Sequence, residues 1–365
     1  MSHPFRRRQK LLRPTQREQG VRPPFERSDD RATGSLDDVK SAVDRELRLF
    51  LRDRRSALVD AAPMVDEIER LIDSGGKRIR PAFCYWGYRA AAGSADGAAV
   101  RVAASLELLH TFAIVHDDIM DAAEERRGVP TVHVRKGVDV ALLVGDLALV
   151  LADALFFGSG FTAEDLGRAF EFYSRMRQQV IAGQYLDLEL ARSSTVSEER
   201  ARWVAVLKSG RYSVEHPLAI GASLGNASVA LRAGLSRFGA PLGEAFQLRD
   251  DLLGSFGQRA SVGKPVDSDI RQGKRHVLYA KTVAALRGDE RDFFVRRWGG
   301  GDSLDGEEVE ALRALLESSG ARAATEALVE QLTDRALKEL RRLSLAPDVA
   351  EGLEELALSV TFRSS

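Results

Sequence analysis

The stretch Ala99–Asp121, AVRVAASLELLHTFAIVHDDIMD, decides the fold class of this chain. Its apolar residues recur with helical spacing, and neither proline nor glycine interrupts it. It ends in HDDIMD, where Asp117 and Asp121 stand four residues apart and share one face, with Asp118 beside them. The stretch therefore predicts a long helix that carries a cluster of carboxylates at its C-terminal end.

Similar helical patterns follow one another, with short breaks, from Ser35 onward. Ser35 and either Ser197 or Thr195 precede acidic residues and are expected to cap helices. The segment Gly254–Gly273 is rich in glycine, proline, serine and aspartate and is expected to form one long loop. No convincing run alternates apolar and polar residues as a half-buried strand does. The sequence therefore predicts a single all-α domain over residues 35–365.

Residues 1–34 differ from the rest of the chain. The first 31 residues hold nine lysines and arginines, four acidic residues and four prolines, without an apolar period. Such a composition does not bury enough apolar surface to fold. We expect a disordered basic extension, with a surface-binding or targeting arm as the alternative.

Composition excludes several classes of protein. The 365 residues are 44% hydrophobic and carry a formal net charge of −1, which supports a large core and disfavours a nucleic-acid binder. Cys84 is the single cysteine, so an internal disulfide and a multi-cysteine zinc site are excluded. A lone cysteine fits a reducing compartment, and we expect a cytoplasmic protein.

The most apolar stretch is Gly137–Phe157, GVDVALLVGDLALVLADALFF. Asp139, Asp146 and Asp153 interrupt it at seven-residue spacing, so they fall on one side of a helix. A bilayer span would rarely carry three carboxylates. We expect a mostly buried helix with one polar stripe, and no transmembrane segment.

A second pair of aspartates, Asp250 and Asp251, lies inside the apolar pattern EAFQLRDDLLGSF, with Gln247 a turn earlier on the same face. Like charges at helical spacing repel each other, and hard divalent cations bound by carboxylate oxygens would compensate. Two acidic clusters in one helical chain predict facing helices that hold metals between them. Each cluster alone is also typical of a solvated helix end.

The segment GGKRIRP, residues 75–81, has the features of an anion site. Its glycines let the backbone approach an anion, and Lys77 and Arg80 lie three residues apart at a helix start. It lacks the spacing of a Walker A loop, and a basic turn is the alternative. Further cations are scattered along the chain at Arg126, Arg127, Lys208, Lys264 and Lys274. Together with the acidic clusters they indicate a site for two polyanions, one of them bridged by metal.

Six ordered motifs resemble those of the trans-isoprenyl diphosphate synthases, the polyprenyl synthetase family. They are GGKRIRP, ELLHTFAIVHDDIMDAAEERRGVPTVH, AGQYLDL, KSGRYSVEHPL, FQLRDDLLGSFG and GKPVDSDIRQGKR, and they span about residues 70–280. The resemblance implies an all-α helical bundle around a deep central cavity. It also implies a Mg²⁺-dependent prenyltransferase that condenses isopentenyl diphosphate with an allylic diphosphate, and a homodimer.

The same resemblance assigns roles to individual residues. The Mg²⁺ ligands at the allylic diphosphate would be Asp117 and Asp121, with Asp118 supporting, and Asp250 with Asp251 close by. Contacts to the allylic diphosphate would come from Arg126, Lys208 and Lys264. Isopentenyl diphosphate would be held by Lys77, Arg80, His110 and Arg127. Gln184, Ser209 and Gln247 would line the reaction centre, and Asp187 and Lys274 would complete its surroundings.

Two positions depart from the family pattern. Gly254 stands where the second acidic motif often has a third aspartate, and Ser209 stands where threonine is usual. The metal-binding first aspartate is kept, so we expect activity with weaker metal binding.

Product length is expected to depend on Phe112, five residues before Asp117. It lies about 7.5 Å deeper along the helix but roughly 140° around it, so helix geometry supports a cavity floor only in part. In the family, the fifth position before the acidic motif resembles a floor of the cavity in which the product elongates. Phe112 followed by the small Ala113 is similar to the arrangement in synthases of the geranylgeranyl type. The resemblance therefore implies geranylgeranyl diphosphate as the product, with farnesyl diphosphate next.

Two other functions stay open. A class I terpene cyclase-like enzyme needs the metals but not isopentenyl diphosphate, and the retained GGKRIRP block and Arg127 argue against it. A non-catalytic subunit of a heteromeric prenyl synthase is disfavoured because both acidic motifs are present.

Overall fold

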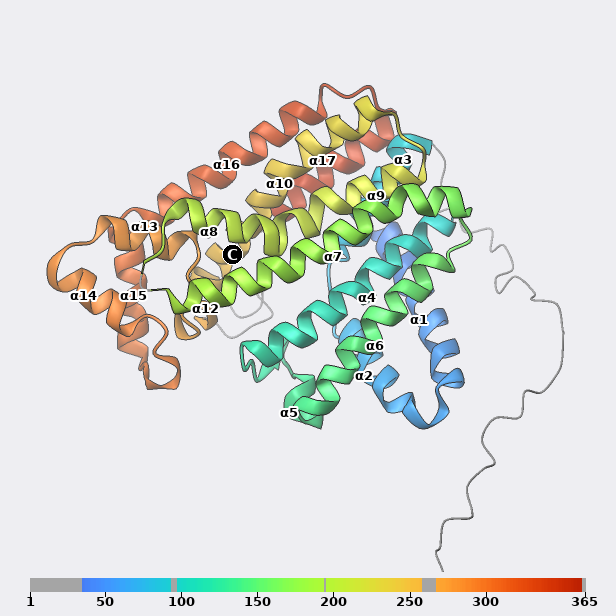
Figure 1. The fold of residues 1–365 in the computed structure, drawn as a ribbon. Helices are drawn as coiled ribbons and strands as arrows, with labels where there is room; N and C mark the ends of the chain where they lie inside the picture. The colour runs from blue at the N-terminus through green and yellow to red at the C-terminus, as the bar shows by residue number, and fades with distance from the viewer. Residues whose placement is uncertain (1–34, 93–96, 194, 258–266, 363–365) are drawn as a thin grey trace, which may run out of the picture. The chain divides into compact units, whose positions relative to one another are not determined.

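The computed structural model describes residues 35–92, 97–193, 195–257 and 267–362. Within these residues every regular element is a helix except for two short strands that pair antiparallel. The all-α fold class is therefore confirmed (Figure 1). The expected extension, residues 1–34, lies outside the described residues and stays a prediction.

The elements follow each other closely along the chain. In order they are α1 (Leu36–Ala57), η1 (Val59–Ala61), α2 (Ala62–Asp73), α3 (Ile79–Ala92), α4 (Gly97–Met120), β1 (Glu125–Arg126), β2 (Val129–Pro130), α5 (Val132–Lys136), α6 (Val138–Phe157), α7 (Ala163–Arg192), α8 (Glu198–Ala205), η2 (Val206–Glu215), α9 (His216–Leu224), α10 (Val229–Phe256), α12 (Ser268–Arg271), α13 (Val277–Ala285), α14 (Gly288–Arg297), η3 (Gly301–Ser303), α15 (Gly306–Ser318), α16 (Ala321–Leu340) and α17 (Pro347–Thr361).

Local chemistry explains several helix ends. Ser35 accepts a hydrogen bond from the backbone of Asp38 and closes a capping box, and Ser197 caps α8 through the backbone of Arg200, as the sequence predicts. The expected long loop begins later than predicted. Helix α10 continues to Phe256, because Leu252 and Leu253 still pack into the interior.

Two hydrophobic cores share α10. Phe238, Leu242 and Phe246 of α10 pack in the larger core with α1 to α4, α6, α7 and α9. Leu248 and Leu252 pack in the smaller core with α8 and α12 to α16. In Figure 1, α13, α14 and α15 lie together at one end of the long helices. A helix with apolar residues toward both cores keeps only a narrow polar face, and the second acidic motif lies on it.

Among the described residues, α4 and α6 are long and apolar enough to span a membrane by length and composition. The apolar window of α4 is 78% buried inside the chain, whereas that of α6 is only 44% buried. The expectation of a mostly buried helix over Gly137–Phe157 is therefore wrong for the isolated chain. Besides its aspartates, α6 exposes large apolar side chains, Leu143, Val150 and Phe157 among them.

Candidate active site

The C-terminal end of α4 places the first acidic motif beside cations. Asp118 is almost fully buried, and Nε and Nη2 of Arg126 contact its Oδ1 at 2.7 and 2.6 Å. Asp117 lies 3.2 Å from Nζ of Lys208 and 3.6 Å from Arg126. Repulsion between like charges on an exposed helix costs only about 0.2–0.5 kcal/mol per pair, whereas a buried unpaired charge costs more. The ion pairs therefore decide whether this cluster is tolerated.

Asp187 on α7 connects two lysines in the same network. Its Oδ2 accepts a hydrogen bond from Nζ of Lys208 at 2.7 Å and lies 3.9 Å from Nζ of Lys274. Lys274 in turn donates to Asp121 at 2.5 Å. Burial alone would raise the pKa of Asp187, but the two ammonium groups outweigh it and hold that pKa below its ordinary value. Asp187 is thus more central than the sequence predicted.

A close helix contact puts Lys208 in this position. A Cβ on Gly183 of α7 would lie 2.4 Å from the backbone nitrogen of Lys208, so only glycine allows this approach. Asp187 follows Gly183 by four residues and therefore lies on the same face of α7. The segment η2 that carries Lys208 is π-helical, a form that is frequent at functional sites.

The polar face of α10 supplies the second acidic motif. Gln247 donates a hydrogen bond to Oδ1 of Asp251 at 2.7 Å, and the side chain of Asp251 is buried. Within the described part of the chain, Oδ2 of Asp251 has no hydrogen-bond partner. Burial, followed by the charges of Asp269 and Asp250, raises the pKa of Asp251 well above its ordinary value. The charge of Asp187, which also binds Lys208 beside Asp117, contributes to the raised pKa of Asp251.

Asp269 occupies the space beside Gly254. A Cβ at Gly254 would lie 2.0 Å from Oδ2 of Asp269, a contact that real side chains do not make. The missing third aspartate of the motif is therefore matched by a carboxylate from α12. The sequence alone did not single out Asp269, because its contact with Gly254 depends on how the segment after α10 folds back onto that helix.

The residue types in the acidic region are those that a hard divalent cation prefers as ligands. The donor set consists of carboxylate oxygens, one of them the orphaned Oδ2 of Asp251. In the described residues no three His, Cys, Asp or Glu side chains converge as metal ligands. Lys208 and Lys274 bind the carboxylates of Asp117, Asp121 and Asp187 instead. A metal would therefore compete with these ammonium groups.

The predicted anion site at the start of α3 is assembled around Arg80. Its guanidinium donates to Ser213 at 2.8 Å and lies 4.3 Å above the ring of Tyr212, both from η2. Its buried Nε has no hydrogen-bond partner among the described side chains. The ring nitrogen Nδ1 of His110 lies 3.3 Å from the hydroxyl of Tyr212. Ser213 and Tyr212 were not predicted as site residues.

Neighbouring charges keep His110 neutral. Burial lowers the pKa of His110 well below its ordinary value, and the charges of Arg80, Arg127 and Arg126 lower it further. Arg127 donates to the backbone carbonyl of Gly75, which ties it to the GGKRIRP block. The structure thus brings His110, Arg80 and Arg127 into one positively charged region.

The remaining predicted residues are placed as follows. Gln184 donates a hydrogen bond to the sulfur of Met120 at 3.5 Å. The ring of Phe112 packs edge-on against that of His116. Ser209 and Ala113 are half-buried, whereas Lys77 is exposed. Lys264 lies outside the described residues, so its expected contact stays a prediction.

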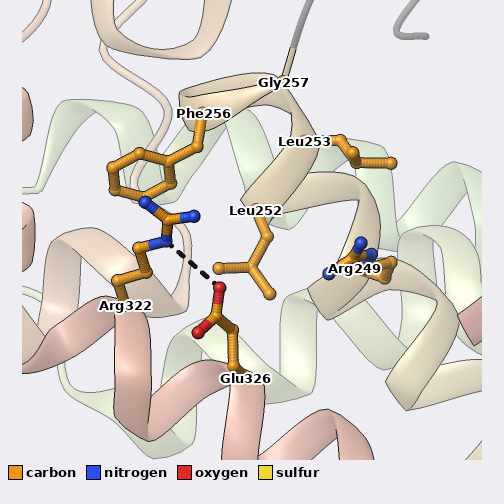
Figure 2. Close-up of a pocket in the computed structure, with 7 residues that line it drawn as sticks. All are labelled: Arg249, Leu252, Leu253, Phe256, Gly257, Arg322 and Glu326. Atoms are coloured by element: carbon orange, nitrogen blue, oxygen red, sulfur yellow. Dashed lines mark hydrogen bonds and ion pairs between the residues drawn. The ribbon is translucent and has the colours of Figure 1, made fainter. Parts of the chain in front are cut away.

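A small pocket lies apart from this constellation (Figure 2). It is lined by residues of α10 and α16. The guanidinium carbon of Arg322 lies 4.4 Å from the centre of the Phe256 ring, and its Nε donates a hydrogen bond to Oε1 of Glu326 at 3.1 Å. The guanidinium of Arg322 is thus already paired inside the pocket. None of the predicted site residues lines it.

The site thus combines carboxylates on α4 and α7 that lie beside lysines and an arginine, and carboxylates on α10, with a separate cluster of cations around Arg80. The polyprenyl synthetase family matches residues 63–316, and the chain belongs to this family. It is 31% identical to the (2E,6E)-farnesyl diphosphate synthase of Mycobacterium tuberculosis over 82% of this chain and 83% of that protein. It is 29% identical to the geranylgeranyl diphosphate synthase of Saccharolobus solfataricus over 87% of this chain and 93% of that protein.

A solved structure agrees with the sequence matches. The geranylgeranyl pyrophosphate synthase of Corynebacterium glutamicum, solved with isoprenyl diphosphate and magnesium, superposes with a TM-score of 0.87 at 33% identity. The match covers 90% of this chain and all of that one. Fold and family are therefore those that the six motifs indicated.

Restoring the family's aspartate is expected to harm this protein. In Gly254→Asp the new side chain would collide with Asp269 and add a charge beside Asp251, so we expect a loss of about 2 kcal/mol in the free energy of unfolding. Thermal unfolding with and without Mg²⁺ measures it. Asp269→Ala in the same chain should recover part of the loss. A Gly254→Asp variant that is as stable as the wild type and binds Mg²⁺ more tightly would contradict this account.

Proposed function

We propose that this prenyltransferase condenses isopentenyl diphosphate with allylic diphosphates, using Mg²⁺, and that its main product is geranylgeranyl diphosphate. The observation that carries the proposal is that α4 reaches both charged regions: His110 lies in the cationic region with Arg80 and Arg127, and Asp117 lies in the acidic region. His110 precedes Asp117 by seven residues, so the two regions lie on one helix face about 10 Å apart. That separation suits two diphosphates whose chains meet between them.

The allylic diphosphate is assigned to the acidic region. Asp117, Asp121 and Asp250 would hold Mg²⁺, and Asp187 stands between them as a further ligand. Bound there, Mg²⁺ would neutralise the diphosphate and stabilise it as it leaves. The lysines Lys208 and Lys274, now paired with these carboxylates, would then turn their ammonium groups to the diphosphate.

Isopentenyl diphosphate is assigned to the cationic region. The buried Nε–H of the Arg80 guanidinium has no partner within the described ranges of the chain and would be available to an anion. Arg127 and Lys77 flank it, and neutral His110 can donate one hydrogen bond.

The reaction needs no protein base in this assignment. Ionisation of the allylic C–O bond places negative charge on the departing diphosphate, which Arg126 and the ammonium groups of Lys208 and Lys274 would stabilise once these have turned from the carboxylates. The alkene of isopentenyl diphosphate then attacks the cation, and the released diphosphate takes up the final proton. Apolar side chains such as Phe112 and Ala113 keep water from the cation.

The oligomer is proposed to be a homodimer formed through α6. Leu143, Val150 and Phe157 are all exposed and recur every seven residues, so they form one stripe along the helix. Phe157 contacts the ring of Phe170 on α7, which extends the apolar surface. A second copy offers a matching stripe. We also propose a cytoplasmic location, consistent with a buried thiol at Cys84.

Turnover is expected to require Mg²⁺ and both acidic motifs. Asp117→Asn or Asp250→Asn should lower kcat about 100-fold or more, because each removes charge that holds the metal. Circular dichroism and product formation from isopentenyl and farnesyl diphosphates check fold and rate. Near-native activity of either variant at saturating Mg²⁺ would refute the assignment. Turnover of one diphosphate alone would support a terpene cyclase, and inactivity of the purified chain would support a non-catalytic subunit.

Product length is expected to respond to Phe112. Below it along α4 lie Leu108 and Ser105 at helical spacing, so Phe112→Ala should open space for a longer chain. The variant should shift products to twenty-five carbons or more, as measured by chromatography of the dephosphorylated products. Ala113→Phe is the opposite change and should shorten them. An unchanged product spectrum in Phe112→Ala would remove Phe112 as the floor.

The dimer is expected to depend on the α6 stripe. Leu143→Glu combined with Val150→Glu should give a monomer in sedimentation experiments, because charges would face each other across the contact. Val229→Glu is a matched control, since Val229 is even more exposed than Leu143 and Val150 but lies at the start of α10. A wild-type monomer, or a double variant that stays dimeric, would contradict the proposed interface.

A further inference from the structure

The loop between α2 and α3 has an unusual backbone. Gly75 and Gly76 have φ angles of 107° and 148°, and Arg78 has a φ of 50°. Glycine adopts such angles freely, but a residue with a side chain adopts the left-handed conformation only at a cost. The loop carries Lys77 and leads directly into Arg80. Something must hold Arg78 in this conformation.

The side chain of Arg78 supplies that restraint. It is 3% exposed, and its Nε bonds Oδ1 of Asp44 at 2.6 Å while Nη1 bonds Oε1 of Glu107 at 2.8 Å. Nη2 donates to the carbonyl of Ile72 at 2.7 Å, and Nη1 lies 3.4 Å from the carbonyl of Gly75. One guanidinium thus joins α1, α4 and the backbone on the N-terminal side of its own loop.

This arrangement ties the loop to the helix of the other site residues. Glu107 precedes His110 by three residues on α4 and so lies on a neighbouring position of the same face. A Cβ on Gly76 would lie 2.6 Å from Nη1 of Arg78 and 3.3 Å from Nη2 of Arg127. The glycine backbone is therefore packed over both guanidinium groups. The position of the loop relative to α4 depends on these contacts.

We propose that Arg78 is a positioning residue for isopentenyl diphosphate: by anchoring the glycine loop to Asp44 and Glu107, it fixes the start of α3 so that Arg80 lies beside His110. The inference rests on the proposed function. Arg78 itself points away from the substrate, since its donors are engaged by protein oxygens. Lysine cannot replace it, because a single ammonium group does not present donors in a planar fork.

The test is Arg78→Lys, which keeps the charge and loses the fork. We expect KM for isopentenyl diphosphate to rise about tenfold, with kcat and KM for farnesyl diphosphate changed by less than about twofold. Glu107→Gln, which weakens the same anchor, should shift KM in the same direction. Arg89→Lys on α3 is the matched control, because Arg89 pairs with Asp348 away from the site, and it should change neither KM.

The outcomes separate this inference from the proposed function. Wild-type protein that shows no calorimetric binding of isopentenyl diphosphate and no turnover would overturn both. Wild-type binding with an unchanged KM in Arg78→Lys, whether or not the melting temperature falls, would overturn only the role of Arg78. Where Arg78→Lys does not fold, Asp44→Asn serves instead, because Asp44 is partly exposed. It should raise the same KM about threefold, and an unchanged KM overturns the inference.

Discussion

The ion pairs of Lys208 and Lys274 with three carboxylates are the interaction on which the site depends. Asp117 and Asp121 come from the end of α4 and Asp187 from α7, while the lysines come from η2 and from the segment after α12. Carboxylates this close to one another and shielded from water would each be costly without a counter-charge. The network therefore fixes where four distant segments meet, and its two ammonium groups hold the pKa of Asp187 below its ordinary value.

Helix α4 acts as the common support of the acidic region and of the cationic region around Arg80. Its last turn carries the acidic motif, and one heptad earlier it carries His110, with Glu107 anchoring the glycine loop through Arg78. Segment η2 makes a second link, since it contributes Lys208 on one side and the partners of Arg80, Tyr212 and Ser213, on the other. Rigid elements that reach both regions hold two substrates in register better than separate loops would.

Two departures from expectation have physical causes. Gly254 looks like a lost ligand in the sequence, but Asp269 fills that space, so a side chain at 254 would displace a carboxylate that is already there. The apolar surface of α6 looks like core in the sequence, yet Leu143, Val150 and Phe157 face outward in the single chain. Hydrophobicity predicts that a surface will be covered, but it does not say by which chain.

The sequence by itself determined the helical class, several caps and the motif residues, because these depend on spacing along the chain. Helical periodicity brings Asp117 and Asp121 to one face, and Ser35 and Ser197 cap through bonds to the backbone three residues on. Only the tertiary structure decided that Asp187 lies between two lysines, that Asp269 stands beside Gly254, and that Arg78 anchors a loop rather than a ligand. Each of these depends on contacts between residues far apart in sequence, such as the approach of Gly183 to Lys208, and the packing of whole helices sets such contacts.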